Sequence, residues 1–355
     1  MMTPVKRVNR FFLLLTAPFL GLLICMWWYR PPLELDLDVG QFTAISGPLN
    51  ETADLKKDLT LAEGTVSYTI DAISASAKLY KGTTAVMNKL VETAKTQASR
   101  PELIYNRRIS AKLGIPSEVL SSDRIRIELY QLNPGNYKAY ALKIKLKDPT
   151  AMQMSLAEEA TGGAETTMHA VQSHGAIAGI NAGGFADKAG KRYPLSTTVV
   201  DGKYLNGFEP TFKDLSFVGL NKSGQLIGGK FYSRAQLDQL EPVFGATFVP
   251  VLLKNNVKVP IPEKWKTSPN RAPRTVIGNY KDDQLLIFVA DGYNELGSSG
   301  AQLEEIQNKL YNMGVMDAYN LDGGGSSSLI FNGRVVNKPS DGNLRAVPTN
   351  FLFFE

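Results

Sequence analysis

The glycines of this chain are concentrated in its C-terminal two thirds. Only five of the 31 glycines in 355 residues lie before Gly114. Because glycine favours turns and destabilises helices, this distribution predicts helical structure first and a turn-rich, strand-containing body afterwards. We therefore expect three parts: residues 1–30 as a terminal tip and anchor, residues 31–113 as a helical stalk or packing region, and residues 114–355 as the main domain.

An uncharged apolar run at residues 11–29 follows three cationic residues, the last of them Arg10. Nineteen helical residues reach roughly 28 Å, which is close to the thickness of a bilayer core. The preceding positive charges predict a single-pass membrane protein with a cytoplasmic N-terminus and an extracytoplasmic main domain. A signal peptide cleaved here, or a lipoprotein, would need small residues before Cys25, where Leu23 and Ile24 stand. We therefore expect an uncleaved signal anchor.

A heptad-like stripe runs through the helical region. Its members, spaced alternately by four and three, are Val66, Ile70, Ile73, Ala77, Tyr80, Thr84, Met87, Val91, Ala94 and Ala98. Such spacing places side chains on one helical face. The stripe is either a coiled-coil stalk that self-associates weakly through residues 66–98 or an amphipathic helix lying on its own domain. Small and polar members and Gly82 favour the second interpretation, and Gly64 predicts a break between two helices.

The residues after Asp123 alternate like strands and contain many turn residues. The run 125–146 alternates around Asn-Pro-Gly-Asn at 133–136, which is typical of a hairpin. Further strand-like runs lie at 176–180, 196–200, 215–220, 248–253, 285–290 and 329–331, and helical stretches at 155–174, 233–240 and 300–313. Blocks of strands with scattered helices predict an α+β fold with mixed, largely antiparallel sheets.

Composition excludes several functional classes. A single cysteine rules out an intramolecular disulfide and a cysteine-rich zinc site, and two histidines leave little room for imidazole-based metal chemistry. We therefore expect neither a metal nor a cofactor. The net charge of +5 is spread without a long basic run, so nucleic acid is not an expected partner.

Two segments place polar groups at the ends of predicted strands. GINAGGF at 179–185 runs from a strand into paired glycines, where a ligand can approach the backbone closely. RAPRTVIG at 271–278 puts Arg274 at the start of one strand, and LLIFVADG at 285–292 puts Asp291 at the end of the next. Functional groups often collect on such loops. The structural alternatives are a tight bend in the first segment and a buried ion pair between Arg274 and an aspartate.

A third segment, YNLDGGGSSSLIF at 319–331, combines a strand end, a carboxylate and a glycine run. The backbone N–H groups of residues 323–325 and the hydroxyl of Ser326 would suit an anion. Asp322 at the mouth of this cradle is a candidate acid, base or nucleophile. A glycine-rich hairpin loop is the structural alternative.

Five motifs, taken in this order, resemble the phosphodiester glycosidase family. They are INAGGF, PRTVIG, VADG followed by Glu295, NLDGGGSSS, and NGRVVNKPSDG at 332–342. The resemblance covers about residues 125–355. It implies a hydrolase that cleaves a sugar 1-phosphodiester, such as an N-acetylglucosamine-1-phosphodiester, and leaves a phosphomonoester on the other partner.

The implied reaction suggests a role for each matching residue. Breaking an anomeric C–O bond develops oxocarbenium character, so the site needs a carboxylate to stabilise or attack the carbon or to activate water. It also needs cationic and N–H donors for phosphate. Asp322 is the first candidate for the carboxylate, Asp291 the second and Glu295 the third. The expected substrate ligands are Asn181, Gly183, Gly184, Arg274, Thr275, Gly323, Gly324, Gly325 and Ser326.

Two other functional classes fit part of the pattern. A non-catalytic protein that binds cell-envelope glycans would keep the sugar and phosphate contacts, and a metal-dependent phosphodiesterase would cleave the P–O bond instead. The carboxylates favour an enzyme. Extracytoplasmic placement would make its substrate an envelope polysaccharide or another glycopolymer.

Overall fold

The computed structural model describes residues 16–25, 27–28, 50–157, 162–292 and 300–355, and it separates into two compact units, Met1–Lys89 and Leu90–Glu355. In the first unit, residues 16–25 and 27–28 are helical with exposed side chains. The rest of the predicted anchor, residues 11–15, 26 and 29, lies outside the described residues. No helix within the described ranges combines the length and the apolar character that crossing a bilayer requires. The anchor therefore stays a prediction.

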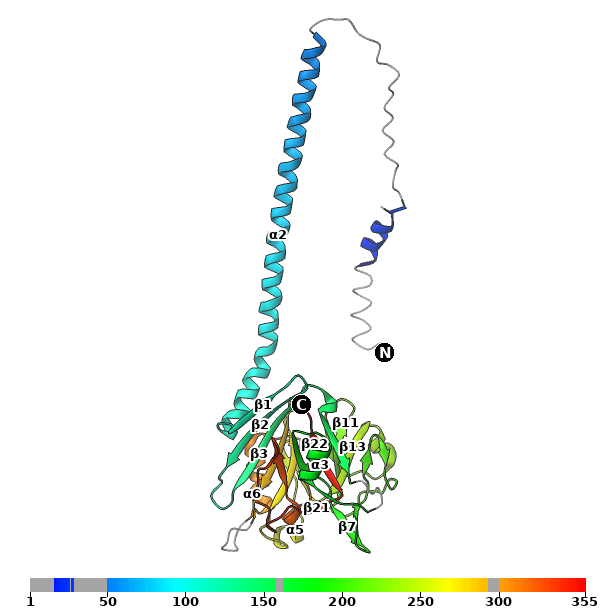
Figure 1. The fold of residues 1–355 in the computed structure, drawn as a ribbon, viewed down its shortest axis with the longest axis vertical. Helices are drawn as coiled ribbons and strands as arrows, with labels where there is room; N and C mark the ends of the chain where they lie inside the picture. The colour runs from blue at the N-terminus through cyan, green and yellow to red at the C-terminus, as the bar shows by residue number, and fades with distance from the viewer. Residues whose placement is uncertain (1–15, 26, 29–49, 158–161, 293–299) are drawn as a thin grey trace. The chain divides into compact units, whose positions relative to one another are not determined.

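Helix α2 (Asn50–Leu113) is one continuous helix (Figure 1). It runs through Gly64, so the predicted break there is wrong. A glycine in an exposed helix costs only about 1 kcal/mol relative to alanine, which is too little to interrupt 64 helical residues. Every stripe side chain from 66 to 98 is exposed. Both interpretations of the stripe stay predictions.

The last turns of α2 pack into the second unit. Ile109 and Leu113 are buried in an apolar cluster with the sheet that follows. Beside them, Lys143 Nζ donates to Asn106 Oδ1 and forms an ion pair with Glu128 Oε2, each at 2.8 Å. The end of α2 therefore belongs with the sheets, whereas the predicted domain boundary stood after residue 113.

The largest sheet has eight strands in the order β1-β2-β3-β17-β16-β18-β14-β15. Their bounds are β1 (Glu118–Ser121), β2 (Ile125–Leu132), β3 (Ala139–Leu146), β14 (Val251–Lys254), β15 (Val257–Lys258), β16 (Arg274–Asn279), β17 (Leu285–Ala290) and β18 (Asp317–Asn320). The predicted hairpin at 125–146 is confirmed, because β2 and β3 pair with Ile125 opposite Leu146.

Two five-stranded sheets complete the body. One has the order β10-β9-β13-β11-β12: β9 (Val199–Val200), β10 (Lys203–Tyr204), β11 (Ser216–Asn221), β12 (Leu226–Gly229) and β13 (Pro242–Phe248). The other has the order β20-β19-β6-β22-β4: β4 (Met152–Leu156), β6 (Ala178–Asn181), β19 (Leu329–Phe331), β20 (Arg334–Val335) and β22 (Thr349–Phe353). Two short ribbons pair β5 (Glu165–Thr166) with β21 (Ala346–Val347) and β7 (Phe185–Lys188) with β8 (Lys191–Pro194).

The helices of the body are short and lie on the sheets. They are α3 (Thr167–Ser173), α4 (Arg234–Asp238), α5 (Glu263–Thr267) and α6 (Leu303–Met313), with 3-10 turns η2 (Pro149–Ala151) and η3 (Gly324–Ser326). The helix predicted at 300–313 is confirmed as α6, which Gly314 ends in the left-handed conformation. The helix predicted at 155–174 is wrong over its described N-terminal part, because residues through Leu156 belong to β4.

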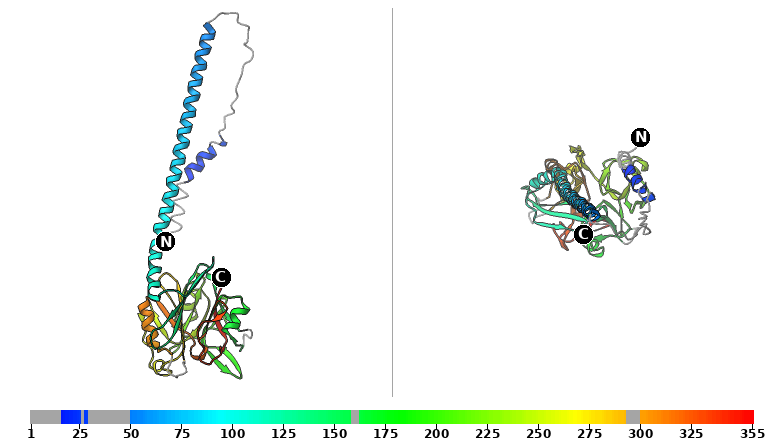
Figure 2. Two further views of the ribbon diagram at one scale, coloured as in Figure 1. Left: turned by 60° about the vertical axis from the view of Figure 1, so that its left-hand side comes forward. Right: turned by 90° about the horizontal axis from the view of Figure 1, so that it is seen from above.

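The core lies where the three sheets face one another. Alternate β17 residues, such as Ile287, join side chains of all three sheets in one buried cluster, while their neighbours, such as Phe288, face α6 and the end of α2. This alternation explains why β17 is apolar throughout, since both of its faces are covered. The predicted α+β class is confirmed, and every strand pair within the described residues is antiparallel. Figure 2 shows the strands and short helices of the second unit from two further sides.

Candidate active site

Strand ends of the large sheet bring the predicted aspartates to the same edge. β16 starts at Arg274, which pairs with Ala290, the last residue of β17, so Asp291 follows directly at that edge. On the other side of β16, strand β18 ends at Asn320, two residues before Asp322. Antiparallel order therefore places two carboxylate-bearing turns on either side of the start of one strand.

Asn181 joins this edge to the sheet that contains β6. Its Nδ2 donates to the backbone oxygen of Asp322 at 2.6 Å, and its Oδ1 accepts from Thr275 Oγ1 at 2.9 Å and from Ser328 N at 3.1 Å. Asn181 and Thr275 are both fully buried. In this structure they hold the glycine loop in place, and their predicted contact with substrate stays a prediction.

Two of the backbone N–H groups expected to suit an anion, those of Gly323 and Gly324, are hydrogen-bonded within the protein. Asp322 Oδ1 accepts the N–H of Gly323 at 3.0 Å, and the N–H of Gly324 donates to Pro273 O at 2.9 Å. Gly324 has a φ of +61°, a conformation that favours glycine. The buried hydroxyl of Ser326 has no hydrogen-bond partner within normal distance in the described structure. The same hydroxyl acts on the Asp322 carboxyl, whose pKa it tends to lower.

An ion pair covers the loop at Gly325. Arg345 Nη2 lies 2.7 Å from Asp341 Oδ2. An ideal Cβ on Gly325 would lie 2.1 Å from each of these two atoms. The glycine therefore makes room for a charged pair that contacts the loop directly.

Opposing effects act on the ionisation of Asp322. Burial raises the pKa of this carboxyl, while hydrogen bonding from Ser326 and the Gly323 N–H and the charges of Arg345 and Arg192 act to lower it. The net pKa remains above that of an ordinary aspartate. Both guanidinium groups also pair with other carboxylates, Arg345 with Asp341 and Arg192 with Asp187, so part of their positive charge is offset.

Arg192 reaches this region from β8. Its Nε donates to Asp187 Oδ1 at 3.1 Å, its Nη1 donates to the backbone oxygen of Ala346, and its guanidinium carbon lies 4.8 Å from the centre of the Phe185 ring. Arg192 is therefore fixed in place by the β7–β8 ribbon and by β21.

Arg274 lies under the glycine loop and is buried without a carboxylate partner among the described residues. Its side chain donates to the backbone oxygens of Pro269 at 2.9 Å and Ala301 at 3.5 Å. Burial lowers its pKa to about 10. Neither Asp291 nor Asp322 pairs with it, so the structural alternative of an ion pair with these aspartates is not observed.

Asp291 is held by the segment after β20. Its Oδ1 accepts the N–H of Lys338 at 2.9 Å, and Asn337 in turn donates to Ser327 O at 3.0 Å. Burial raises the pKa of Asp291, and hydrogen bonds from Lys338 and Asn337 oppose that rise. Because Asp341 and Arg345 follow a few residues later, one loop, residues 336–345, contacts the surroundings of both aspartates.

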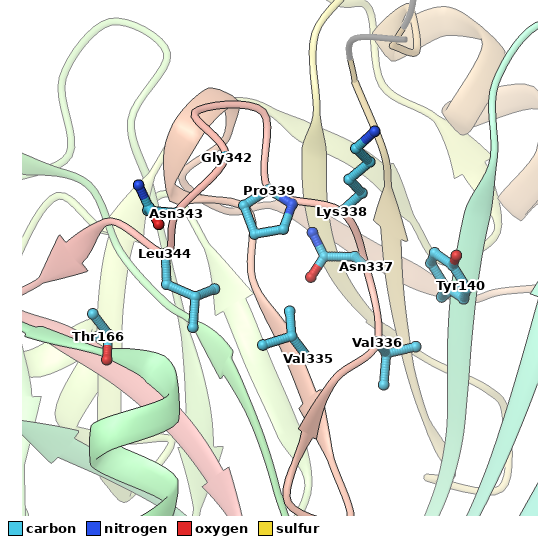
Figure 3. A pocket seen from close by; sticks show the side chains of 10 residues that line it. All are labelled: Tyr140, Thr166, Val335, Val336, Asn337, Lys338, Pro339, Gly342, Asn343 and Leu344. Carbon is cyan, nitrogen blue, oxygen red and sulfur yellow. The ribbon is translucent and has the colours of Figure 1, made fainter.

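The same loop forms one wall of a pocket of about 660 Å³ (Figure 3). Tyr140 lies on one side and Thr166 on the other, with Asn337, Asn343 and Leu344 between them. The lining mixes apolar and hydrogen-bonding groups, which suits a polar organic ligand.

Gly183 and Gly184 pack against β13. A Cβ at Gly183 would lie 2.6 Å from Ala246 Cβ, and one at Gly184 would lie 2.4 Å from the Phe248 ring. These glycines let the chain pass close to β13. That gives them a packing role, and their predicted contact with substrate stays untested.

Glu295 lies outside the described residues. Within the described ranges, no group of three or more His, Cys, Asp and Glu side chains is placed to hold a metal ion. The residues brought together are Asn181, Arg274, Thr275, Asp322, Gly323, Gly324, Gly325 and Ser326, with Asp291 on the adjoining flank.

Sequence reasoning missed Arg192, Asp341 and Arg345. Arg192 belongs to none of the five motifs, and its place depends on how two ribbons fold against the loop. Asp341 lies within the terminal motif, and Arg345 lies three residues beyond its end. The only available signal was the closeness of Arg345 to that motif.

Comparison with known proteins settles the family. The model of the phosphodiester glycosidase domain matches residues 174–354, slightly more than half of the chain. The chain belongs to the phosphodiester glycosidase family. The residues gathered around Asp322, from Asn181 to Arg345, fall within this match, whereas Tyr140 and Thr166 of the pocket lie before it.

Curated phosphodiester glycosidase relatives share part of the sequence. The human N-acetylglucosamine-1-phosphodiester alpha-N-acetylglucosaminidase is 31% identical over 137 residues, 35% of this chain and 26% of that protein. The mouse protein of the same name is 27% identical over 161 residues, 41% of this chain and 30% of that protein. The matching segments thus span less than a third of the length of these relatives.

A solved structure shares the fold. The catalytic domain of the zebrafish N-acetylglucosamine-1-phosphodiester alpha-N-acetylglucosaminidase, auto-inhibited by its pro-peptide, superposes with a TM-score of 0.53. The identity is 22%, over 68% of this chain and 87% of that one. This likeness supports the phosphodiester glycosidase fold of the body.

Proposed function

We propose that this chain is a hydrolase that cleaves the bond between the anomeric carbon and the phosphate of a sugar 1-phosphodiester. The substrate class comes from family membership and from the names of the curated relatives, which act on N-acetylglucosamine-1-phosphodiesters. The products would be the free sugar and a phosphomonoester.

One observation carries the proposal: the half-buried carboxylate of Asp322 stands beside a glycine loop that three arginines surround. Arg192 and Arg345 influence Asp322 through their charges, and Arg274 lies buried beneath the loop. Arg192 and Arg345 already pair with Asp187 and Asp341. Arg274 has only backbone acceptors among the described residues, so a phosphodiester would supply its missing counter-charge. Guanidinium groups suit phosphate because they donate two parallel hydrogen bonds.

We assign each of these groups a role in the reaction. The guanidinium groups and the Ser326 hydroxyl would hold the phosphodiester and stabilise the charge that grows on the leaving oxygen. Asp322, as a carboxylate, would face the positive charge that develops at the anomeric carbon. Water adds to that carbon, the C–O bond breaks, and its electrons remain on the phosphate oxygen. The water proton passes to Asp322, Asp291 or solvent.

Hydrolysis in ¹⁸O-labelled water tests this assignment. The probe is the methyl phosphodiester of N-acetylglucosamine 1-phosphate. The methyl phosphodiester of mannose 1-phosphate is the comparison substrate. We expect label in the released sugar and none in methyl phosphate. Label in a phosphate product with release of methanol would instead show P–O cleavage by a phosphodiesterase.

Binding without turnover would show a glycan-binding protein. Calorimetry with the same methyl phosphodiester separates that outcome from an inactive preparation, because an intact site would still bind the ligand. Chelator treatment adds a second distinction, since a metal-dependent phosphodiesterase would lose its activity.

We further propose that residues 11–29 anchor the enzyme with its body outside the cytoplasm, facing an envelope polysaccharide or another glycopolymer. The uncharged run and the cationic residues before it support this placement. Carbonate extraction of membranes and protease protection of intact cells test it. Release of the full chain by carbonate would contradict the anchor, and resistance to external protease would contradict the orientation.

A further inference from the structure

A large apolar surface is left open along α2. Side chains of residues 54–104 are all exposed in the described structure. Six large members of the stripe are between 48% and 80% exposed: Val66, Ile70, Ile73, Tyr80, Met87 and Val91. A solvent-exposed helix of this length gains its stability mainly from packing an apolar face, so this face requires an occupant.

The spacing of the stripe fits a supercoiled helix pair. Steps of four and three give a mean period of 3.5 residues, and the stripe keeps this period from residue 66 to residue 98. That period keeps one seam facing a partner helix along its whole length. Small members such as Ala77 and Ala94 are interspersed among larger ones, which allows two helices to approach closely at those positions.

The distribution of charges along the stripe allows two identical helices to pack together. None of its ten members is charged, and the positions beside it carry only Lys81 and Lys95. In a parallel, in-register pair each flanking contact joins a lysine to an uncharged residue: Lys81 meets Ser76 and Lys95 meets Leu90. Like charges therefore never face each other along this pair.

A groove on the helix surface lies along the same region. Tyr68 and Tyr80 stand at its two ends, and Ala72, Ser76 and Ala77 are among the described residues that form its floor. A hollow between large side chains receives a side chain from a facing helix in knobs-into-holes packing.

We propose that α2 pairs through residues 66–98 with α2 of a second copy of this chain, in a parallel coiled coil. Covering the six large side chains in both copies would remove on the order of 1,000 Å² from water, which approaches the size of stable protein interfaces. A helix lying flat on a membrane would instead carry a strongly cationic polar face, whereas Asp71 and Glu92 are interspersed with lysines here. The pairing is independent of the proposed activity.

Sedimentation equilibrium of the full chain in a mild detergent tests the pairing. We expect a dimer whose dissociation constant rises at least tenfold in Ile73→Asp. The matched control is Ala75→Asp, which places the same charge two residues away and off the seam, and it should remain a dimer. A monomeric wild-type protein, or equal association of both variants, would overturn the proposal.

Disulfide cross-linking tests the register and direction. In a Cys25→Ser background, Ala77→Cys should form a disulfide-linked dimer on mild oxidation, because seam positions face their own copies in a parallel pair. Ala75→Cys, the same substitution off the seam, should cross-link at least tenfold less. Equal cross-linking at both positions, or none at residue 77, would refute the parallel in-register arrangement.

Discussion

Gly325 and Arg345 compete for the same space: a Cβ on the glycine would lie 2.1 Å from the guanidinium Nη2. Gly325 does not have a positive φ, so crowding by the side chain explains the glycine, and backbone conformation does not. The Arg345–Asp341 pair therefore takes its position from the absence of a side chain at residue 325.

Gly325→Ala should displace Arg345 from the loop. Because the blocking atoms are the far ends of flexible side chains, the fold should be retained. The melting temperature should fall only slightly. We expect KM for the phosphodiester to rise at least ~10-fold, about 1.4 kcal/mol, if Arg345 contacts phosphate. Gly324→Ala is the matched control, since a Cβ there meets nothing within 4 Å but the backbone has a φ of +61°. The Gly324→Ala variant should lose about 1 kcal/mol in free energy of unfolding. Its KM should stay nearer to the wild-type value than that of Gly325→Ala.

Asp322→Asn should lose at least ~100-fold in kcat, about 2.7 kcal/mol, because the carboxylate charge disappears while the shape remains. The variant should melt at the same temperature as wild type or higher, since burial already disfavours the ionised form. Steady-state kinetics and melting curves decide the matter. Turnover close to wild type would reassign the role to Asp291.

The raised pKa of Asp322 predicts the pH dependence of activity. If the carboxylate is the active form, kcat/KM falls as pH drops through this pKa, and the acid limb lies above the ~3.9 of an ordinary aspartate. The free energy of unfolding should change with pH in the opposite direction to kcat/KM. The contribution from Asp322 is complete below the ordinary pKa and is lost as pH rises through the raised one. Comparing stability against pH for wild type and Asp322→Asn isolates this contribution.

Arg274→Lys keeps a positive charge but loses the planar fork and its two backbone contacts. We expect weaker substrate binding, with KM raised ~10-fold or more, and a modest loss of stability because a buried ammonium is harder to satisfy. The kinetic comparison of Arg274→Lys with Arg274→Met separates charge from geometry. A KM for Arg274→Lys equal to that of wild type would show that the planar guanidinium group has no role in binding.

Lys143→Met should destabilise the body by about 3 kcal/mol, because it leaves the buried Glu128 without its main counter-charge. Burial alone would raise the pKa of Glu128, but hydrogen bonds from Lys143, Tyr130 and Arg126 lower it. Adding Glu128→Gln should recover much of the loss. Chemical denaturation of the two variants provides the measurement, and additive losses in the double variant would contradict the pairing.

Local patterns predicted the elements that depend on nearby residues. The hairpin of β2 and β3 follows from alternation around a turn, and α6 follows from its apolar spacing and the glycine after it. That hairpin register also places Glu128 opposite Lys143. The unbroken helix through Gly64 could not be predicted from that residue alone, because the cost of one glycine is small against the whole helix.

The candidate site was predictable only where motifs mark strand ends. Asp291, Arg274 and Asp322 follow from such ends, and antiparallel order explains why they meet. Arg192 influences the Asp322 carboxyl through its charge from a ribbon far away in the sequence, and Arg345 does so from the loop before β21. Their positions depend on packing between sheets, which no local pattern encodes.

Strand β22 lies between β6 and β4, although it is the last strand in the sequence. During synthesis, β6 and β4 leave the ribosome long before the strand that must separate them. Until β22 is made, β6 and β4 each keep an unpaired edge, which is open to hydrogen bonding with the wrong strand. The Asn181 end of β6, which pairs with Asn350 of β22, is therefore completed only after residues 349–353 have left the ribosome, so the candidate site is assembled after all of its residues have been made.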